Sequence, residues 1–303
     1  MKIETIKIES EVDKLILEAI EIVPEKEIKG IVQISHGMAE HKERYIPLME
    51  YLAQNGYVSV IHDHRGHGKS IKSKENLGYF YDESAEFIVE DLHQITNWIT
   101  HKYPNKPIIL LGHSMGSMVV RKYIKKYDTD IDKLIVCGSP SNNPFAGIAI
   151  EIAKIISIVK GKHYRSQLLQ KLAFGTYAKK FPEGTSENRW ICSDEDIVKD
   201  YDQDELNGFT FTLNGFINLF TLMKEIYQKN GWKVNNKNLP ILFIAGSDDP
   251  VIINKAKWEK SQEFLKKIGY TNIQAKLYEK MRHEILNECE KEIVWNDVIS
   301  WIE

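Results

Sequence analysis

The chain has 303 residues, 43% of them hydrophobic and 27% charged, and its formal net charge is −3. These values allow one large or two ordinary domains with a sizeable core, and they exclude a disordered chain. They give no electrostatic support for nucleic-acid binding, which usually needs a basic surplus, and no run of about 18 uncharged apolar residues predicts a membrane span.

Short β-rich runs alternate along the chain with longer stretches of helical periodicity. The runs "IVQIS", "IILLG", "LIVCG" and "ILFIAG" are continuously apolar, which is typical of strands buried on both faces of a parallel sheet. No helical stretch separates the first two strands, so we expect an antiparallel start to the sheet. The predicted strands are Ile3–Ile8, Lys14–Val23, Gly30–Ser35, Tyr57–His62, Pro107–Gly112, Lys133–Cys137, Pro240–Gly246 and Ile273–Tyr278.

The alternation of strands and helices stops in residues 139–238, where the sequence shows no convincing buried strand. Helical periodicity dominates this segment, and Phe145–Val159 and Asn214–Tyr227 are its clearest helices. We therefore expect an α/β fold with a mostly parallel eight-stranded sheet flanked by helices. Residues 1–138 and 239–303 would form its core, and the intervening segment a helical cap over the edge where open α/β sheets bind ligands.

The segment "PIILLGHSMGSMVVRKYI" places a serine between a predicted strand and a predicted helix. Its centre, "GHSMG", fits the G-x-S-x-G pattern, in which a nucleophile projects from a sharp turn and small neighbours prevent clashes. An ordinary glycine-rich turn can show the same five residues, but the flanking strand and helix favour a nucleophile. We therefore predict that Ser114 is the nucleophile and that the Met115 N–H, at the positive helix end, stabilises an oxyanion.

A serine nucleophile needs a base, and the base needs an orienting acid; in this arrangement they follow in the order acid, then histidine. Two histidines lie downstream of the serine. We predict that His283, in the loop after the last strand, is the base and that His163, in the expected cap, faces solvent. The acid is expected in "GSDDPV", where Asp249 is favoured and Asp248 is read as a turn residue.

The loop "SHGMAEHKERY" follows the strand "IVQIS". Gly37 lets the backbone pass close to a substrate, so we predict that the Met38 N–H is the second oxyanion donor. The polar residues of this loop are expected to brace it rather than to do chemistry. They are His36, Glu40, His41 and Arg44.

Two other polar segments offer alternative sites. "HDHRGHGKS" spaces His62, His64 and His67 like metal ligands, but no downstream cluster of His, Asp and Cys completes a metal shell. The acid-rich run from Ser193 to Glu205 can hold a cation or a substrate amine, although such runs more often form a solvated helix face. We therefore expect neither a metal nor an organic cofactor.

Five motifs carry a family resemblance: "SHGMAEHKERY", "DHRGHGKS", "LLGHSMGSMVV", "AGSDDPV" and "RHEILNE". In this order they resemble the α/β-hydrolases of the monoacylglycerol lipase and lysophospholipase group, often described as serine-aminopeptidase-like. The resemblance spans roughly Lys29 to the C-terminus and implies an α/β-hydrolase fold with a cap. One departure is Ala39, where many members have Gly, and this substitution stiffens the loop.

The resemblance also implies the site and the reaction. It places the nucleophile on Ser114, the acid on Asp249, the base on His283 and the oxyanion N–H groups on Met38 and Met115. It implies cleavage of carboxylic esters through an acyl-enzyme, with monoacylglycerols or lysophospholipids as substrates and without a cofactor. A general short-chain carboxylesterase, an aminopeptidase of the same fold and a non-catalytic binding protein are the alternatives.

The location of the protein is inferred from weaker signals. Acids interrupt the first ten residues, where an export signal needs an apolar core, and three separated cysteines indicate reduced thiols. We therefore expect a cytoplasmic protein. The apolar surface of Phe145–Val159 indicates an acyl-chain tunnel, transient contact with a membrane surface, or packing on the core. The oligomeric state and the acyl-chain length are left open.

Overall fold

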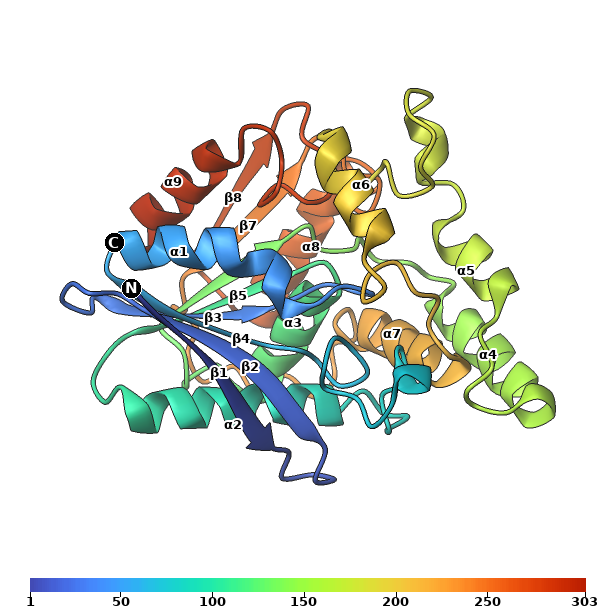
Figure 1. Ribbon diagram of the computed structural model, residues 1–303, viewed down its shortest axis with the longest axis horizontal. Coiled ribbons are helices and arrows are strands. Elements are labelled where there is room, and N and C mark those ends of the chain that lie inside the picture. Colours follow the sequence, from blue (N-terminus) through green and yellow to red (C-terminus); the bar gives the residue numbers. More distant parts are fainter.

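A computed structural model describes residues 1–303, and its eight strands form one sheet in the order β1-β2-β4-β3-β5-β6-β7-β8 (Figure 1). The predicted α/β fold class is confirmed, and each predicted strand is found within two residues of its expected bounds. The strands are β1 Lys2–Glu9, β2 Ile16–Val23, β3 Gly30–Ser35, β4 Tyr57–His62, β5 Ile108–His113, β6 Lys133–Cys137, β7 Ile241–Gly246 and β8 Ile273–Tyr278.

The sheet begins antiparallel and continues parallel. Strand β1 pairs with β2, and β2 with β4, in antiparallel register, as predicted from the missing helix between the first two strands. From β4 through β3 to β8, all neighbouring strands are parallel. Strands β3, β4, β5 and β7 are buried along their whole length, because helices cover both faces of the sheet.

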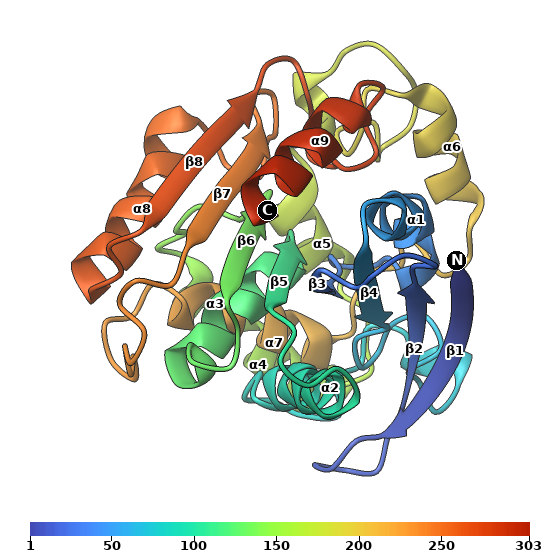
Figure 2. The same cartoon turned by 90° about the vertical axis from the view of Figure 1, so that its left-hand side faces the viewer.

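Helices pack on both faces of the sheet (Figure 2). On one face, Leu48 of α1 and Val298 of α9 join a single apolar cluster with the strands. On the other, Leu92 of α2, Val119 of α3 and Leu265 of α8 join a second and larger cluster. The helices are α1 Ile46–Gln54, α2 Phe87–Lys102, α3 Met115–Tyr127, α4 Ala146–Lys160, α5 Gln167–Phe174, α6 Glu195–Gln203, α7 Leu213–Glu225, α8 Lys255–Ile268 and α9 Lys291–Ile302.

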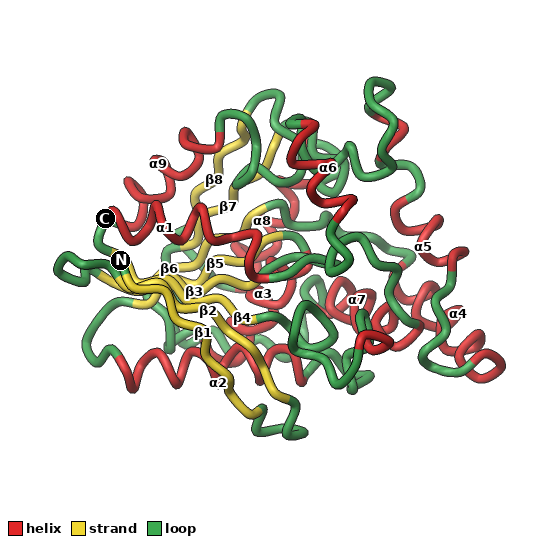
Figure 3. The backbone as a smooth tube through the Cα atoms, in the orientation of Figure 1, coloured by secondary structure: helices red, strands yellow, loops and turns green.

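Residues 139–238 contain α4 to α7 and no strand, and they lie beyond one end of the strands (Figure 3). Helix α7 begins at the N-cap Thr212, whose side chain accepts a hydrogen bond from the Gly215 N–H. Its Leu213 and Phe216 are fully buried in the larger apolar cluster, so α7 is packed as firmly as a core helix. Helix α4 packs on α7, and α6 contacts the loop after β3 through Tyr201.

Helix α4 turns most of its apolar surface outward. The sequence groups Ile148, Ile152, Ile155 and Val159 on one face. Ile148, Ile155 and Val159 are 59%, 64% and 79% exposed, whereas Ile152 is half-buried and packs against the larger apolar cluster. The buried face of α4 is narrow. It includes small side chains such as Ala153 and packs against α7. Packing on the core therefore accounts for only part of the apolar surface of this helix and not for the exposed isoleucines and valine. No helix of the structure has the length and apolar character needed to cross a membrane.

Candidate active site

Ser114 lies at the turn between β5 and α3, with φ 53° and ψ −117°, a strained combination for a residue other than glycine. The turn is possible because its neighbours lack side chains. A Cβ on Gly116 would lie 2.0 Å from the Ser35 carbonyl oxygen, and one on Gly112 would lie 2.5 Å from the Gly116 carbonyl oxygen. The serine thus projects from a turn that admits no larger residues at these two positions.

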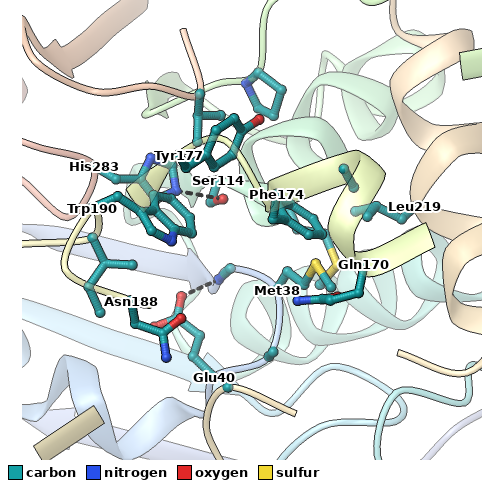
Figure 4. Close-up of a pocket in the computed structure, with 18 of the residues that line it drawn as sticks. Met38, Glu40, Ser114, Gln170, Phe174, Tyr177, Asn188, Trp190, Leu219 and His283 are labelled. Carbon is teal, nitrogen blue, oxygen red and sulfur yellow. Dashed lines mark hydrogen bonds between the residues drawn. The ribbon is translucent and has the colours of Figure 1, made fainter. Parts of the chain in front are cut away.

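The structure brings together the three side chains predicted from the order of motifs. The Nε2 atom of His283 lies 2.8 Å from the Ser114 Oγ (Figure 4). The Nδ1 atom of His283 lies 2.9 Å from Asp249 Oδ2. The other carboxylate oxygen of Asp249 accepts a hydrogen bond from the Val251 N–H, and this aspartate is buried. Asp249 is therefore held with one oxygen aimed at the imidazole.

The two rejected residues lie elsewhere. Asp248 is exposed, and its carboxylate accepts a hydrogen bond from the neighbouring Ser247 hydroxyl. His163 is exposed too, and its ring stacks on that of Tyr79 with 4.0 Å between the ring centroids. Neither side chain is hydrogen-bonded to Ser114 or His283.

The loop after β3 is held by a histidine that sequence reasoning assigned only a general bracing role. The Nε2 atom of His36 accepts a hydrogen bond from the His64 N–H, so its Nδ1 carries the proton and donates to the Gly37 carbonyl at 2.8 Å. All peptide bonds are trans, so the N–H of Met38 points away from that carbonyl. Met38 and Met115 both line the cavity above Ser114.

The family departure at Ala39 falls on a left-handed backbone position. Ala39 has a φ of 51°, a region that glycine occupies without the steric cost that a Cβ adds. Its carbonyl accepts hydrogen bonds from the Gly208 N–H and the Tyr201 hydroxyl, both at 2.9 Å. The positive φ at position 39 explains why glycine suits this position in the family pattern. In this chain the two hydrogen bonds to its carbonyl hold an alanine in the same conformation.

The loop that carries His283 is bonded to the segment 139–238. Arg282 donates to the Cys192 carbonyl at 3.1 Å, and the carboxylate of Glu288 accepts from the Ser193 N–H at 3.0 Å. The same Glu288 oxygen accepts from the backbone N–H of Arg282 at 2.8 Å. The turn around His283 and residues 192–193 are therefore one hydrogen-bonded unit.

A cavity of about 710 Å³ opens above Ser114. Figure 4 shows Phe174 and Leu219 on one side of it and Asn188 and Glu40 on another. The ring of Trp190 lies over His283, with 5.2 Å between the ring centroids. Helices α5 and α7 contribute to the wall, but no residue of α4 does, so the expectation that α4 lines an acyl tunnel is not supported.

The two remaining polar segments contribute no histidine and no acid to the wall of this cavity. His62 and His67 are buried near the sheet, and burial lowers the pKa of each to about 3, so both rings are neutral. No group of three or more His, Cys, Asp or Glu side chains is arranged to hold a metal ion. Of the residues from Ser193 to Glu205, only Tyr201 lines the cavity, and none of the acids does.

A family model described as serine aminopeptidase, S33, matches residues 26–290. The chain belongs to this hydrolase family. A monoacylglycerol lipase of Mycolicibacterium smegmatis is 25% identical over 279 residues, which cover 92% of this chain and 90% of the relative. The recognition of an α/β-hydrolase of the monoacylglycerol lipase and lysophospholipase group, and thus of a carboxylic ester hydrolase, is confirmed at the level of the family.

Solved structures of the family's fold are similar over the whole chain. A thermostable carboxyl esterase from Bacillus coagulans, solved in complex with glycerol, superimposes with a TM-score of 0.89 at 29% identity, covering 100% of this chain and 98% of that one. A monoglyceride lipase of Saccharomyces cerevisiae has a TM-score of 0.74 at 19% identity, with 99% and 94% covered, and supports the fold alone.

Proposed function

We propose that this S33-family hydrolase cleaves carboxylic esters through an acyl-enzyme on Ser114. The observation that carries the proposal is the line of contacts from Ser114 Oγ to His283 Nε2, 2.8 Å, and from His283 Nδ1 to Asp249 Oδ2, 2.9 Å. A hydroxyl is a weak nucleophile unless a base takes its proton, and the base works best when a third group fixes its tautomer. Ser114 supplies the nucleophile, His283 the base and Asp249 the group that fixes the tautomer of the base, and the three side chains come from separate loops.

Acylation begins when His283 Nε2 takes the hydroxyl proton and Ser114 Oγ bonds to the ester carbonyl carbon. The carbonyl oxygen becomes an oxyanion, which the N–H groups of Met38 and Met115 stabilise by hydrogen bonds. His283 then gives its proton to the leaving alcohol oxygen as the carbon–oxygen bond breaks. Asp249 keeps the imidazole in the required tautomer and stabilises its positive charge.

Deacylation repeats these steps with water. His283 takes a proton from the water, whose oxygen bonds to the acyl carbon, and the same two N–H groups stabilise the second oxyanion. The bond to Ser114 Oγ breaks, the serine recovers a proton from His283, and the free acid leaves. None of these steps draws on a group from outside the chain other than ester and water.

We further propose that the substrates are monoacylglycerols or lysophospholipids, which join a polar alcohol to one long acyl chain. The cavity has an apolar side, with Phe174 and Leu219, and a polar side, with Asn188. Its volume lies within the range of about 300–1,000 Å³ typical of ligand sites. The acids of the run 193–205 are absent from its wall, so this run does not offer the amine-binding site that the aminopeptidase alternative assigned to it.

A panel of substrates tests the proposal. We expect kcat/KM for monoacylglycerols from decanoyl to palmitoyl, or for lysophosphatidylcholine, to exceed that for short aryl esters and aminoacyl-naphthylamides. Faster acetyl ester cleavage would make the protein a general esterase. Ser114→Ala should lower kcat by on the order of 10⁶ and abolish labelling by a fluorophosphonate probe, as removal of a nucleophile does in other triads. A loss below tenfold would place the chemistry elsewhere.

We also propose that residues 139–238 act as a cap that contacts membrane surfaces transiently through α4 and α5. Ile158 is 85% exposed at the end of α4, and Leu172 is 68% exposed on α5. The stretch 145–181 has seven basic residues, Lys154, Lys160, Lys162, Arg165, Lys171, Lys179 and Lys180, against one acid, Glu151. Apolar side chains surrounded by lysines favour an anionic bilayer.

Binding to vesicles tests this contact. We expect sedimentation with phosphatidylglycerol vesicles, weaker binding to phosphatidylcholine vesicles, and release by salt because of screening. Ile158→Glu should reduce binding, whereas Ile293→Glu should not, since Ile293 is also exposed, at 49%, but lies on α9. Equal binding by both variants, or a dimer that forms through this face in solution, would overturn the proposal.

A further inference from the structure

Arg44 lies between two buried carboxylates that belong to different loops of the site. Its guanidinium donates to Glu40 Oε2 at 2.6 Å, and to both carboxylate oxygens of Glu284 at 2.7 and 2.6 Å. The side chains of Glu40 and Glu284 are 3% and 5% exposed, and that of Arg44 is 10% exposed. Arg44 does not line the cavity, whereas both carboxylates do.

Glu40 connects Arg44 to the loop that carries the Met38 N–H. Its Oε1 atom accepts a hydrogen bond from the Gly37 N–H at 2.5 Å and another from the Tyr45 hydroxyl at 2.9 Å. The Gly37 N–H closes the turn immediately before Met38. A displacement of the Glu40 carboxylate would therefore move the backbone that points the oxyanion donor into the cavity.

Glu284 connects Arg44 to the base, because it directly follows His283 in the chain. Its own backbone N–H donates to the Ile191 carbonyl at 2.7 Å, so the residue is held from both its main chain and its side chain. The carbonyl of His283 lies 3.3 Å from Nε2 of His113, whose Nδ1 is 3.4 Å from Glu40 Oε1. The same two loops are thus joined by a second and longer chain of contacts.

The second chain is charged as well as hydrogen-bonded. Burial of the His113 ring disfavours its protonation, but the hydrogen bond and negative charge of Glu40 outweigh burial and raise the pKa of His113. Arg44 lies against both buried carboxylates, and His113 contacts one of them. Removal of Arg44 would leave the like charges of Glu40 and Glu284 in a buried space without their shared cation, which is costly.

We propose that Arg44 is a positioning residue, which sets the distance between the Met38 N–H and the imidazole of His283 through Glu40 and Glu284. The inference rests on the proposed function of Met38 and His283. In this role Arg44 does more than brace its own loop. It fixes the relative position of two loops that follow different strands, β3 and β8. The bidentate fork of arginine fixes both carboxylates at once, which the single ammonium of lysine does not do.

Arg44→Lys is the test variant, because it keeps the charge and loses the fork. We expect kcat on the best ester to fall about 10- to 100-fold, the range for a misplacement of roughly 1 Å, while KM changes less than about threefold. A trifluoromethyl ketone analogue, which forms a tetrahedral adduct with a serine, should lose affinity by the same factor as kcat/KM. The fatty-acid product should bind as before, since Arg44 does not touch the cavity.

Arg65→Lys is the matched control. Arg65 is a fully buried arginine that also lies between two carboxylates, Asp91 at 2.8 Å and Asp13 at 3.0 Å, and it contacts neither catalytic loop. We expect this variant to lower the thermal midpoint while kcat of the folded protein stays within about twofold of the original. Both variants are compared only at temperatures where circular dichroism shows them folded.

Three outcomes would overturn the inference. They are an Arg44→Lys protein whose kcat is unchanged, an equal loss of kcat in Arg65→Lys, and a loss confined to KM. If Arg44→Lys does not fold, Glu284→Gln breaks the same bridge from the other carboxylate and must reproduce the loss of analogue affinity. A failed proposed function is recognised separately, because Ser114→Ala would then stay active.

Discussion

The hydroxyl of Tyr201 in α6 donates a hydrogen bond of 2.9 Å to the carbonyl oxygen of Ala39, which lies in the loop after β3. The Tyr201 ring also lies beneath the guanidinium of Arg44, 4.8 Å from ring centroid to Cζ. One aromatic side chain from the segment 139–238 thus contacts two residues of the loop that contains Met38, the proposed oxyanion donor. This contact holds Ala39 in a backbone conformation that its Cβ disfavours.

Replacing Ala39 with Gly should stabilise the protein. The left-handed backbone costs an L-residue about 1 kcal/mol or more relative to glycine, so we expect the free energy of unfolding to rise by up to about 1 kcal/mol. Urea denaturation measures it. Ala53→Gly is the matched control: Ala53 lies in α1, where the same change should destabilise by about 1 kcal/mol. A decrease for both variants would show that position 39 is unstrained.

The adjacent aspartates give a sharp test of the acid. Asp249→Asn should lower kcat by on the order of 10⁴, because the amide favours the wrong imidazole tautomer. Asp248→Asn makes the same chemical change one residue away on an exposed side chain, so its kcat should stay within about twofold. Steady-state kinetics on one ester compares them. A large loss in the Asp248 variant would reverse the assignment.

Filling the apolar side of the cavity should shorten the preferred acyl chain. Leu219→Trp adds volume to the wall, and we expect kcat/KM for a palmitoyl ester, relative to a butyryl ester, to fall by about tenfold or more. Leu168→Trp is the control, because Leu168 of α5 is 58% exposed and does not line the cavity. Equal profiles for the two variants would mean that acyl chains bind elsewhere.

Buried neutral histidines should make the fold sensitive to acid. Unfolding raises the pKa of His62 from about 3 to about 6.5, so the unfolded chain binds more protons and stability falls as pH drops between these values. His62→Leu should reduce that slope by about 1.4 kcal/mol per pH unit between pH 4 and 6. Urea denaturation across this range measures it. The slope should remain unchanged only if the ring is already protonated or exposed.

The sequence predicted the sheet well because four of its strands are continuous apolar runs, which only burial on both faces explains. It also predicted the approach of Ser114, Asp249 and His283, since each follows a strand whose carboxyl end meets the same sheet edge. The roles of His113 and Glu284 were missed. They depend on contacts between loops up to 240 residues apart, such as Arg44 to Glu284, which leave no periodic pattern.

Helix α4 shows what the sequence pattern could not predict about a helix that it located correctly. Its apolar residues predicted a helix correctly, but periodicity cannot tell whether an apolar face meets the core or solvent. The larger face is the exposed one here, because α7 offers room for only a narrow stripe that includes Ile150 and Ala153. The surrounding lysines carry the better signal, since a core-facing helix seldom needs so many.

The bonds from Arg282 and Glu288 to residues 192–193 bear on how chimaeric enzymes of this family should be built. A domain exchange that joins a foreign segment at residues 139 and 238 would keep the original "RHEILNE" loop but remove Ser193 and the Cys192 carbonyl. The turn that carries His283 would then lose these hydrogen-bond partners. A domain exchange therefore has to transfer residues 281–288 together with residues 139–238, although the two segments are not contiguous in the chain.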